Sequence, residues 1–180
     1  DKIFAAVQMH SGTSREVTIR MIRELERAMR EAENDLTDSK RGLLKFALLK
    51  TGMSVGREDI RVSKADNLGG IVAELVESDK RDIRTSQFIE TWRSRIQPLP
   101  GTEFITITPA QGGPPGRDID IRLTGYDLTG LKQAALDVRK LLTRYSGISD
   151  INDSLPYGNK EAIMKLTPHG RALGFTTQNV

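Results

Sequence analysis

Few side chains of this sequence have the types and the spacing that catalysis needs. The chain holds two histidines, and neither His10 nor His169 stands in a motif such as HExxH. It contains no cysteine, which excludes thiol nucleophiles, disulfides and cysteine-bound metals. The glycines of the GGPPG stretch at 112–116 are interrupted by two prolines, which have no N–H group to offer a phosphate. The sequence therefore predicts a protein that is not an enzyme and that holds no cofactor and no metal ion.

Two other groups of residues could bind a ligand without changing it. Asp150, Asn152 and Asp153 come at the end of an expected strand, where their oxygens could coordinate a cation, line a wet pocket or form a solvated turn. Met9 and Met53 could form a soft-metal pair for Cu(I) or Ag(I), or could serve core packing. The sequence alone leaves these alternatives open.

Length and composition are those of an ordinary globular chain. Its 180 residues, 37% hydrophobic and 28% charged, suffice for one large domain or two small ones. The net charge of +3, from 27 basic and 24 acidic residues, is too even to predict a nucleic-acid partner. No expected strand carries the aromatic pattern of an RNA-binding sheet. No apolar run approaches the roughly 20 residues of a membrane helix.

The periodicity of the first part predicts one complete unit over residues 1–109. Short or alternating apolar runs predict strands at 3–9, 44–49, 70–76 and 103–108. Helical spacing predicts a helix that starts with a capping box of Thr13 and Glu16, and a second helix capped by Thr85 or Ser86. The resulting order βαββαβ is that of a ferredoxin-like fold.

The remainder of the sequence predicts a second unit of the same kind that stops early. Residues 110–116 (AQGGPPG) predict a linker, and residues 117–175 predict a unit of order βαββα without a final strand. Its long helix is expected to start at a cap on Asp127 and to end before a left-handed Gly147. The expected strands and the final helical turn lie at 118–124, 148–151, 162–166 and 168–173. The expected fold class is α+β, with two ferredoxin-like units of which the second is incomplete.

Three motifs mark this second part. They are GPPGRDIDIRLTG at 113–125, SGISDINDSL at 146–155 and GRALGFT at 170–176. Together they resemble the porter region of RND-superfamily efflux transporters, of the acriflavine-resistance or hydrophobe/amphiphile-efflux type. The stretch ESDKRDIRTSQFIETWR at 77–93 resembles the family's strand-to-helix segment, so that the resemblance covers nearly the whole chain.

The resemblance implies a soluble porter fragment, from the C-terminal half, of a proton-driven multidrug efflux permease. It also implies small amphiphilic substrates and a parent homotrimer that works with a periplasmic adaptor and an outer-membrane channel. The chain would be the periplasmic portion of a bacterial inner-membrane protein. Residues 176–180 would begin a docking-subdomain insertion that interrupts the second unit.

Polar strand ends and a switch-like loop at 52–67 predict which residues would face the substrate cleft of such a fragment. They are Asp118, Asp120, Arg122, Asn152 and Asp153 in the second unit, and Met53, Val55 and Arg57 in the loop. Two alternatives stay open. One is a stand-alone ferredoxin-like ligand-binding or regulatory module in the cytoplasm, and the other is a metal-efflux member of the same superfamily that uses Met9 and Met53.

Overall fold

The computed structural model describes residues 1–38, 42–56, 63–110, 119–145, 147–154 and 165–176. Its elements follow in the order β1 (Lys2–Met9), α1 (Arg15–Leu36), β2 (Leu44–Thr51), β3 (Leu68–Leu75), a 3-10 turn η1 (Ser78–Lys80), α2 (Thr85–Arg95), β4 (Thr102–Pro109), α3 (Leu128–Leu142) and α4 (Pro168–Ala172). The α+β class predicted from the sequence is confirmed.

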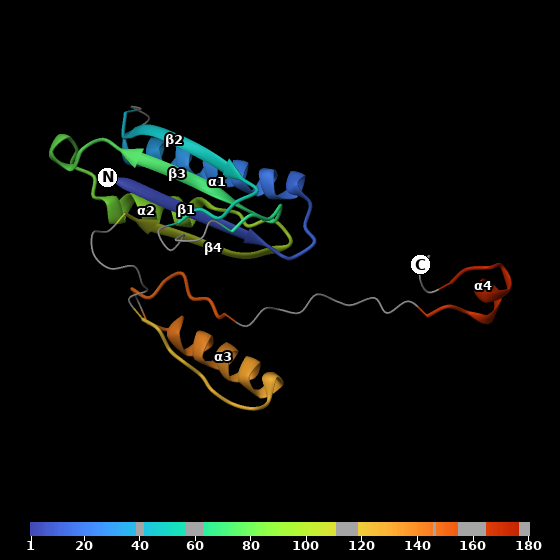
Figure 1. The fold of residues 1–180 in the computed structure, drawn as a ribbon. Helices are drawn as coiled ribbons and strands as arrows, with labels where there is room; N and C mark the ends of the chain where they lie inside the picture. Colours follow the sequence, from blue (N-terminus) through green and yellow to red (C-terminus); the bar gives the residue numbers. More distant parts are fainter. Residues whose placement is uncertain (39–41, 57–62, 111–118, 146, 155–164, 177–180) are drawn as a thin grey trace.

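The four strands form one antiparallel sheet in the order β2-β3-β1-β4. β3 lies between β1 and β2, and β1 lies between β3 and β4, which is the split βαβ arrangement of a ferredoxin-like unit. Both α1 and α2 lie on the same side of this sheet (Figure 1). Residues 1–109 thus have the architecture that their order of elements predicts.

The core lies between the sheet and these two helices. Alternate residues of β1 face it, each at most 2% exposed: Ile3, Ala5, Val7 and Met9. From α2, the fully buried Trp92 donates its indole N–H to the backbone oxygen of Leu25 at 2.9 Å. The Trp92 ring lies 5.8 Å from that of Phe88 on the same helix, and the hydrogen bond from Trp92 to Leu25 holds α2 against α1.

A buried carboxylate ties the end of α1 to the start of β2. Glu33 is 2% exposed, and its Oε1 accepts the backbone N–H groups of Gly42, Leu43 and Leu44 at 3.2, 3.1 and 2.9 Å. These amides lie before or at the first residue of β2, where ladder hydrogen bonds are not yet complete. Glu33 therefore stabilises the connection from helix to strand.

Both predicted helix caps of the first unit are wrong by one or two residues. Ser14, not Thr13, is the N-cap of α1, and its side chain makes no capping hydrogen bond. Arg84 is the N-cap of α2, and the Thr85 hydroxyl instead accepts a hydrogen bond from the Arg81 guanidinium at 2.7 Å. The Thr85 hydroxyl, which the sequence pattern predicts as a helix cap, is thus hydrogen-bonded to Arg81 instead.

In the described part of the second unit, the helices form as predicted. Asp127 caps α3, since its carboxylate accepts the N–H groups of Thr129 at 3.1 Å and Gly130 at 2.8 Å. Gly147 has a φ of 94°, which is the left-handed conformation expected there. The short helix α4 begins at Pro168 behind a Thr167 cap. These signals are local, and the structure confirms them.

The strands predicted for the second unit do not form in its described residues. Residues 119–124 and 148–151 hold no strand, and 162–164 lie outside the described residues. A strand exists only through its neighbours, and no described backbone hydrogen bond pairs these segments with another strand. Ile119, Ile121 and Leu123 are 39 to 53% exposed as a result. The second unit is therefore less complete than predicted, while the boundaries assigned to both units stay predictions.

Candidate functional site

The segment 147–154 is attached to the outer edge of the sheet through Asp150. Asp150 has a φ of +57°, and its Oδ2 accepts a hydrogen bond from Arg93 Nη2 of α2 at 2.7 Å. The same Nη2 donates to the backbone oxygen of Ile107 on β4 at 2.9 Å, and the Ile107 N–H approaches Asp150 Oδ2 at 3.4 Å. The guanidinium of Arg93 and the carboxylate of Asp150 thus bind the backbone C=O and N–H of Ile107, which lies on an edge strand.

Burial sets the electrostatics of this contact. Removal from water raises the pKa of the Asp150 carboxyl, because desolvation disfavours its charged form. The positive charge of Arg93 and the hydrogen bond from Ile107 act in the opposite direction. Burial thus makes the charged form of Asp150 costly. Among the described contacts, Arg93 is the only arginine of α2 that reaches β4, and it lies beside this carboxylate.

A second ion pair connects the same segment to α3. Lys132 Nζ lies 2.7 Å from Asp153 Oδ1, and the two side chains are only 18% and 17% exposed. Asp150 and Asp153 thus link the sheet edge, the segment 147–154 and α3 in one chain of contacts. Neither carboxylate is free to coordinate a cation, because each is engaged by a basic side chain.

The predicted cleft residues fall into separate places. Asn152 and Asp153 are half-buried in the segment just described, whereas Asp120 and Arg122 are exposed in the extended stretch before α3. Met53 is half-buried and Val55 is buried in the loop after β2. Asp118 and Arg57 lie outside the described residues. Among the described hydrogen bonds and ion pairs, none joins the loop residues to those of the second unit.

The methionines proposed for a metal alternative are not equivalent. Met9 is fully buried in the core, and the Thr102 hydroxyl lies 3.6 Å from its sulfur and 3.4 Å from that of Met21. Its thioether is thus used by core packing. Within the described ranges, no group of three or more histidine, aspartate or glutamate side chains could hold a metal ion.

One pattern in the loop after β2 bears on the expectation that the protein is not an enzyme. Residues 52–56 read Gly-Met-Ser-Val-Gly, which matches the GxSxG of a serine nucleophile elbow. That motif needs a strand-to-helix turn with a base beside the serine. The Ser54 hydroxyl instead accepts the backbone N–H of Ser63 at 3.1 Å, and no helix begins among the described residues of this loop. The motif is present without its structural context.

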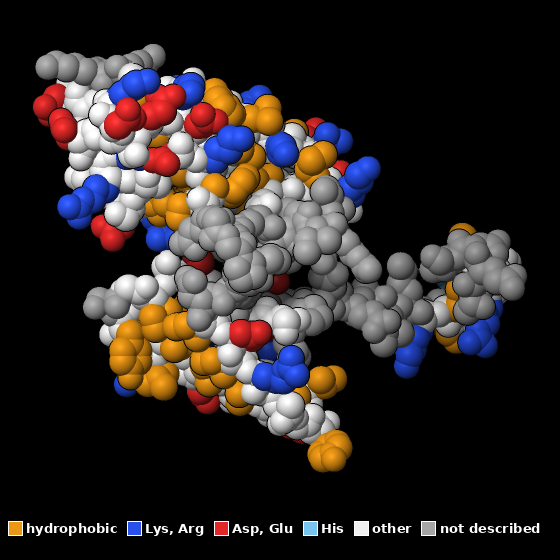
Figure 2. Space-filling view, turned by 60° about the vertical axis from the view of Figure 1, so that its left-hand side comes forward, with side chains coloured by type: hydrophobic (Ala, Val, Ile, Leu, Met, Phe, Trp, Pro, Cys, Tyr) orange, Lys and Arg blue, Asp and Glu red, His pale blue; other side chains and the backbone are white. Residues whose placement is uncertain are grey.

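Exposed apolar side chains gather on the second part of the chain (Figure 2). The exposed fractions are 68% for Leu128, 50% for Leu141 and 58% for Tyr145 on or beside α3. No residue of α3 is buried. A soluble domain leaves few such surfaces uncovered, so this one is suited to contact another molecule or another part of a larger protein.

Comparison of the chain with known proteins adds no relative. No family model, no curated protein and no solved structure matches it. Over the described ranges, no helix has the length and the apolar character needed to cross a membrane.

Proposed function

We propose that the chain is the porter fragment of a proton-driven multidrug efflux permease, located in the periplasm. One observation carries the proposal: a ferredoxin-like unit over residues 1–109 leads, after the GGPPG stretch, into a second part whose apolar surface is uncovered. This pairing is what the resemblance of its motifs to RND-type porter regions implies. The fragment performs no covalent chemistry, and its partners are amphiphilic substrates, two further copies of its parent, an adaptor and an outer-membrane channel.

The stretch before α3 has the chemistry that amphiphile binding requires. Ile119, Ile121 and Leu123 alternate with Asp120 and Arg122, and all of these residues are exposed. An amphiphile carries an apolar body and a polar or charged end, so a surface that offers both kinds of side chain along one stretch can hold either part. Such binding is weak and tolerant, which suits transport of many substrates.

The test uses the full-length protein in bacteria that lack their own efflux pumps. With Asp120→Asn and Arg122→Gln combined, we expect the resistance conferred against amphiphilic drugs to fall about fivefold, the equivalent of about 1 kcal/mol of lost interaction. Arg139→Gln, at an exposed position of α3, is the matched control and should leave resistance unchanged. Unchanged resistance in the double variant, at equal amounts of protein in the membrane fraction, contradicts the assignment.

The same cells separate the alternative functions. A stand-alone ligand-binding module would remain in the cytoplasmic fraction and confer no resistance to amphiphiles. A metal-efflux member would confer resistance to copper or silver salts instead. Because Met9 lies in the core, we expect no such metal resistance.

A further inference from the structure

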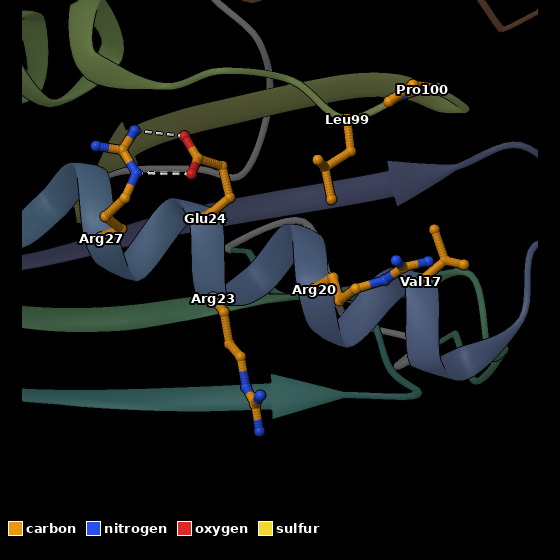
Figure 3. Close-up of a pocket in the computed structure, with 7 residues that line it drawn as sticks. All are labelled: Val17, Arg20, Arg23, Glu24, Arg27, Leu99 and Pro100. Carbon is orange, nitrogen blue, oxygen red and sulfur yellow. Dashed lines mark hydrogen bonds and ion pairs between the residues drawn. The ribbon is translucent and has the colours of Figure 1, made fainter.

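We propose a binding site for a small anionic amphiphile in a hollow on the helical side of the first unit, separate from the cleft proposed above. The hollow has a volume of about 660 Å³ and lies between the flank of α1 and the chain that leads into β4 (Figure 3). Its lining residues are Val17, Arg20, Arg23, Glu24, Arg27, Leu99 and Pro100. This volume falls within the usual range for small-molecule sites, which is about 300–1,000 Å³.

The apolar part of the hollow is held in a fixed position. Leu99 and Pro100 face the Val17 end of α1 across it (Figure 3). The Leu99 N–H lies 3.3 Å from the buried sulfur of Met21, and its carbonyl oxygen accepts the hydroxyl of Thr102 at 2.7 Å. Because both contacts lead into the core, the apolar wall does not depend on a bound ligand to form.

One end of the hollow is already neutralised. Arg27 binds Glu24 through two hydrogen bonds of 2.7 and 2.6 Å, and Glu24 also accepts the backbone N–H of Gln97 at 2.8 Å. These contacts lower the pKa of the Glu24 carboxyl, chiefly through the hydrogen bonds from Arg27, and so keep it ionised. Arg27 further contacts Glu31 at 2.5 Å. This end therefore presents a paired arginine and glutamate rather than an available charge.

The available charge in the hollow belongs to Arg20. Arg20 and Arg23 are exposed, and across the described part of the chain neither forms an ion pair or a hydrogen bond through its side chain. Figure 3 shows Arg20 extended alongside Val17, while Arg23 extends away from Leu99. Arg20 is thus the direct partner for an anionic group, and Arg23 adds positive potential from the other side of the helix.

Together these features select the chemical class of the ligand. A hydrocarbon tail can pack against the apolar wall, and the guanidinium of Arg20 can donate hydrogen bonds to a carboxylate or sulfate headgroup. A cationic amphiphile would place its charge beside Arg20 and is disfavoured. The limited volume and the single direct arginine favour a small molecule over an acidic protein segment, which would need a longer basic surface.

The test is a titration of the 180-residue chain with decanoate, followed by the methyl NMR signals of Val17 and Leu99. Decanol, which lacks the charge, is the matched ligand. We expect decanoate to shift both signals at lower concentration than decanol, and Arg20→Gln to weaken decanoate binding about fivefold. Arg30→Gln is the control because Arg30 lies on the same helix, is exposed and does not line the hollow. The fluorescence of the buried Trp92 verifies that each variant is folded.

Several outcomes overturn the proposal. If the wild type and Arg20→Gln bind decanoate equally well, Arg20 does not contact the headgroup. If the wild type binds decanol and decanoate equally well, the site does not prefer an anion. Shifts confined to Leu48 and Ile121 would place the ligand on other exposed apolar surfaces. Tighter binding of an acidic peptide than of decanoate would assign the hollow to a protein partner. Each result is independent of whether the full-length protein transports drugs.

Discussion

Gly70→Ala is expected to remove a large part of the stability of the first unit. Gly70 lies in the central strand β3, opposite Ala6 of β1. A Cβ atom at this position would lie 2.0 Å from the backbone oxygen of Ala5 and 3.0 Å from the Cα of Ala6. The clash is with backbone, so it cannot be relieved by a side-chain rotation and must separate two paired strands. We expect a loss of about 3–5 kcal/mol, a large part of the roughly 5–15 kcal/mol that stabilises a domain.

Urea unfolding followed by Trp92 fluorescence measures this loss, because Trp92 is fully buried and is the one tryptophan of the chain. Gly56→Ala is the matched control, since a Cβ there meets no atom of the described residues within 4 Å. The control should change the free energy of unfolding by less than about 0.5 kcal/mol. An unfolding midpoint of Gly70→Ala equal to that of the wild type would show that the two strands are not packed as described.

Glu33→Ala is expected to have the second largest effect. The substitution leaves the N–H groups of Gly42, Leu43 and Leu44 without their shared acceptor, and of these residues Leu43 is buried and Leu44 half-buried. We expect the free energy of unfolding to fall by about 3 kcal/mol, since unsatisfied buried donors cost about 1–3 kcal/mol each and part of that cost is relieved by water. Differential scanning calorimetry gives the change through the midpoint temperature.

Two further variants make this prediction specific. Glu33→Gln keeps one acceptor oxygen and should cost less than Glu33→Ala. Glu26→Ala removes a carboxylate from the same helix whose contact with Arg30 is long, at 3.7 Å, and partly exposed. We expect it to cost less than about 0.5 kcal/mol. If Glu33→Ala were as mild as Glu26→Ala, the link between α1 and β2 would have no energetic role.

The parts of the fold that the sequence predicts are those with local signals. The alternation along β1 marks which residues face the core, and the Asp127 cap marks where α3 begins. The split order of the first unit follows from the order of its elements, because two βαβ halves can share a sheet in few ways. The alternation of Ile119, Ile121 and Leu123 predicts a strand that does not form in the described residues, because a pattern with period two becomes a strand only beside a paired neighbour.

The contacts that the sequence does not predict are long-range or depend on side-chain competition. Arg93 and Asp150 are separated by 57 residues, and no local pattern connects them. Glu33 is a charged residue on the buried face of α1. Its three N–H partners belong to the start of β2 and the residues before it, so they can be identified only once the position of that strand is known. Arg20 lacks the carboxylate partners that Arg27 has, and this difference depends on how each side chain is directed in space.

The most direct test of the central claim is dye efflux by the full-length protein in bacteria without other pumps. Cells are loaded with an amphiphilic dye such as Nile red, energised, and followed by the loss of fluorescence. The porter assignment predicts that dye leaves faster than from cells with an empty vector, and that a protonophore removes the difference. Equal rates in both kinds of cell, with the protein present in the membrane fraction, would contradict it.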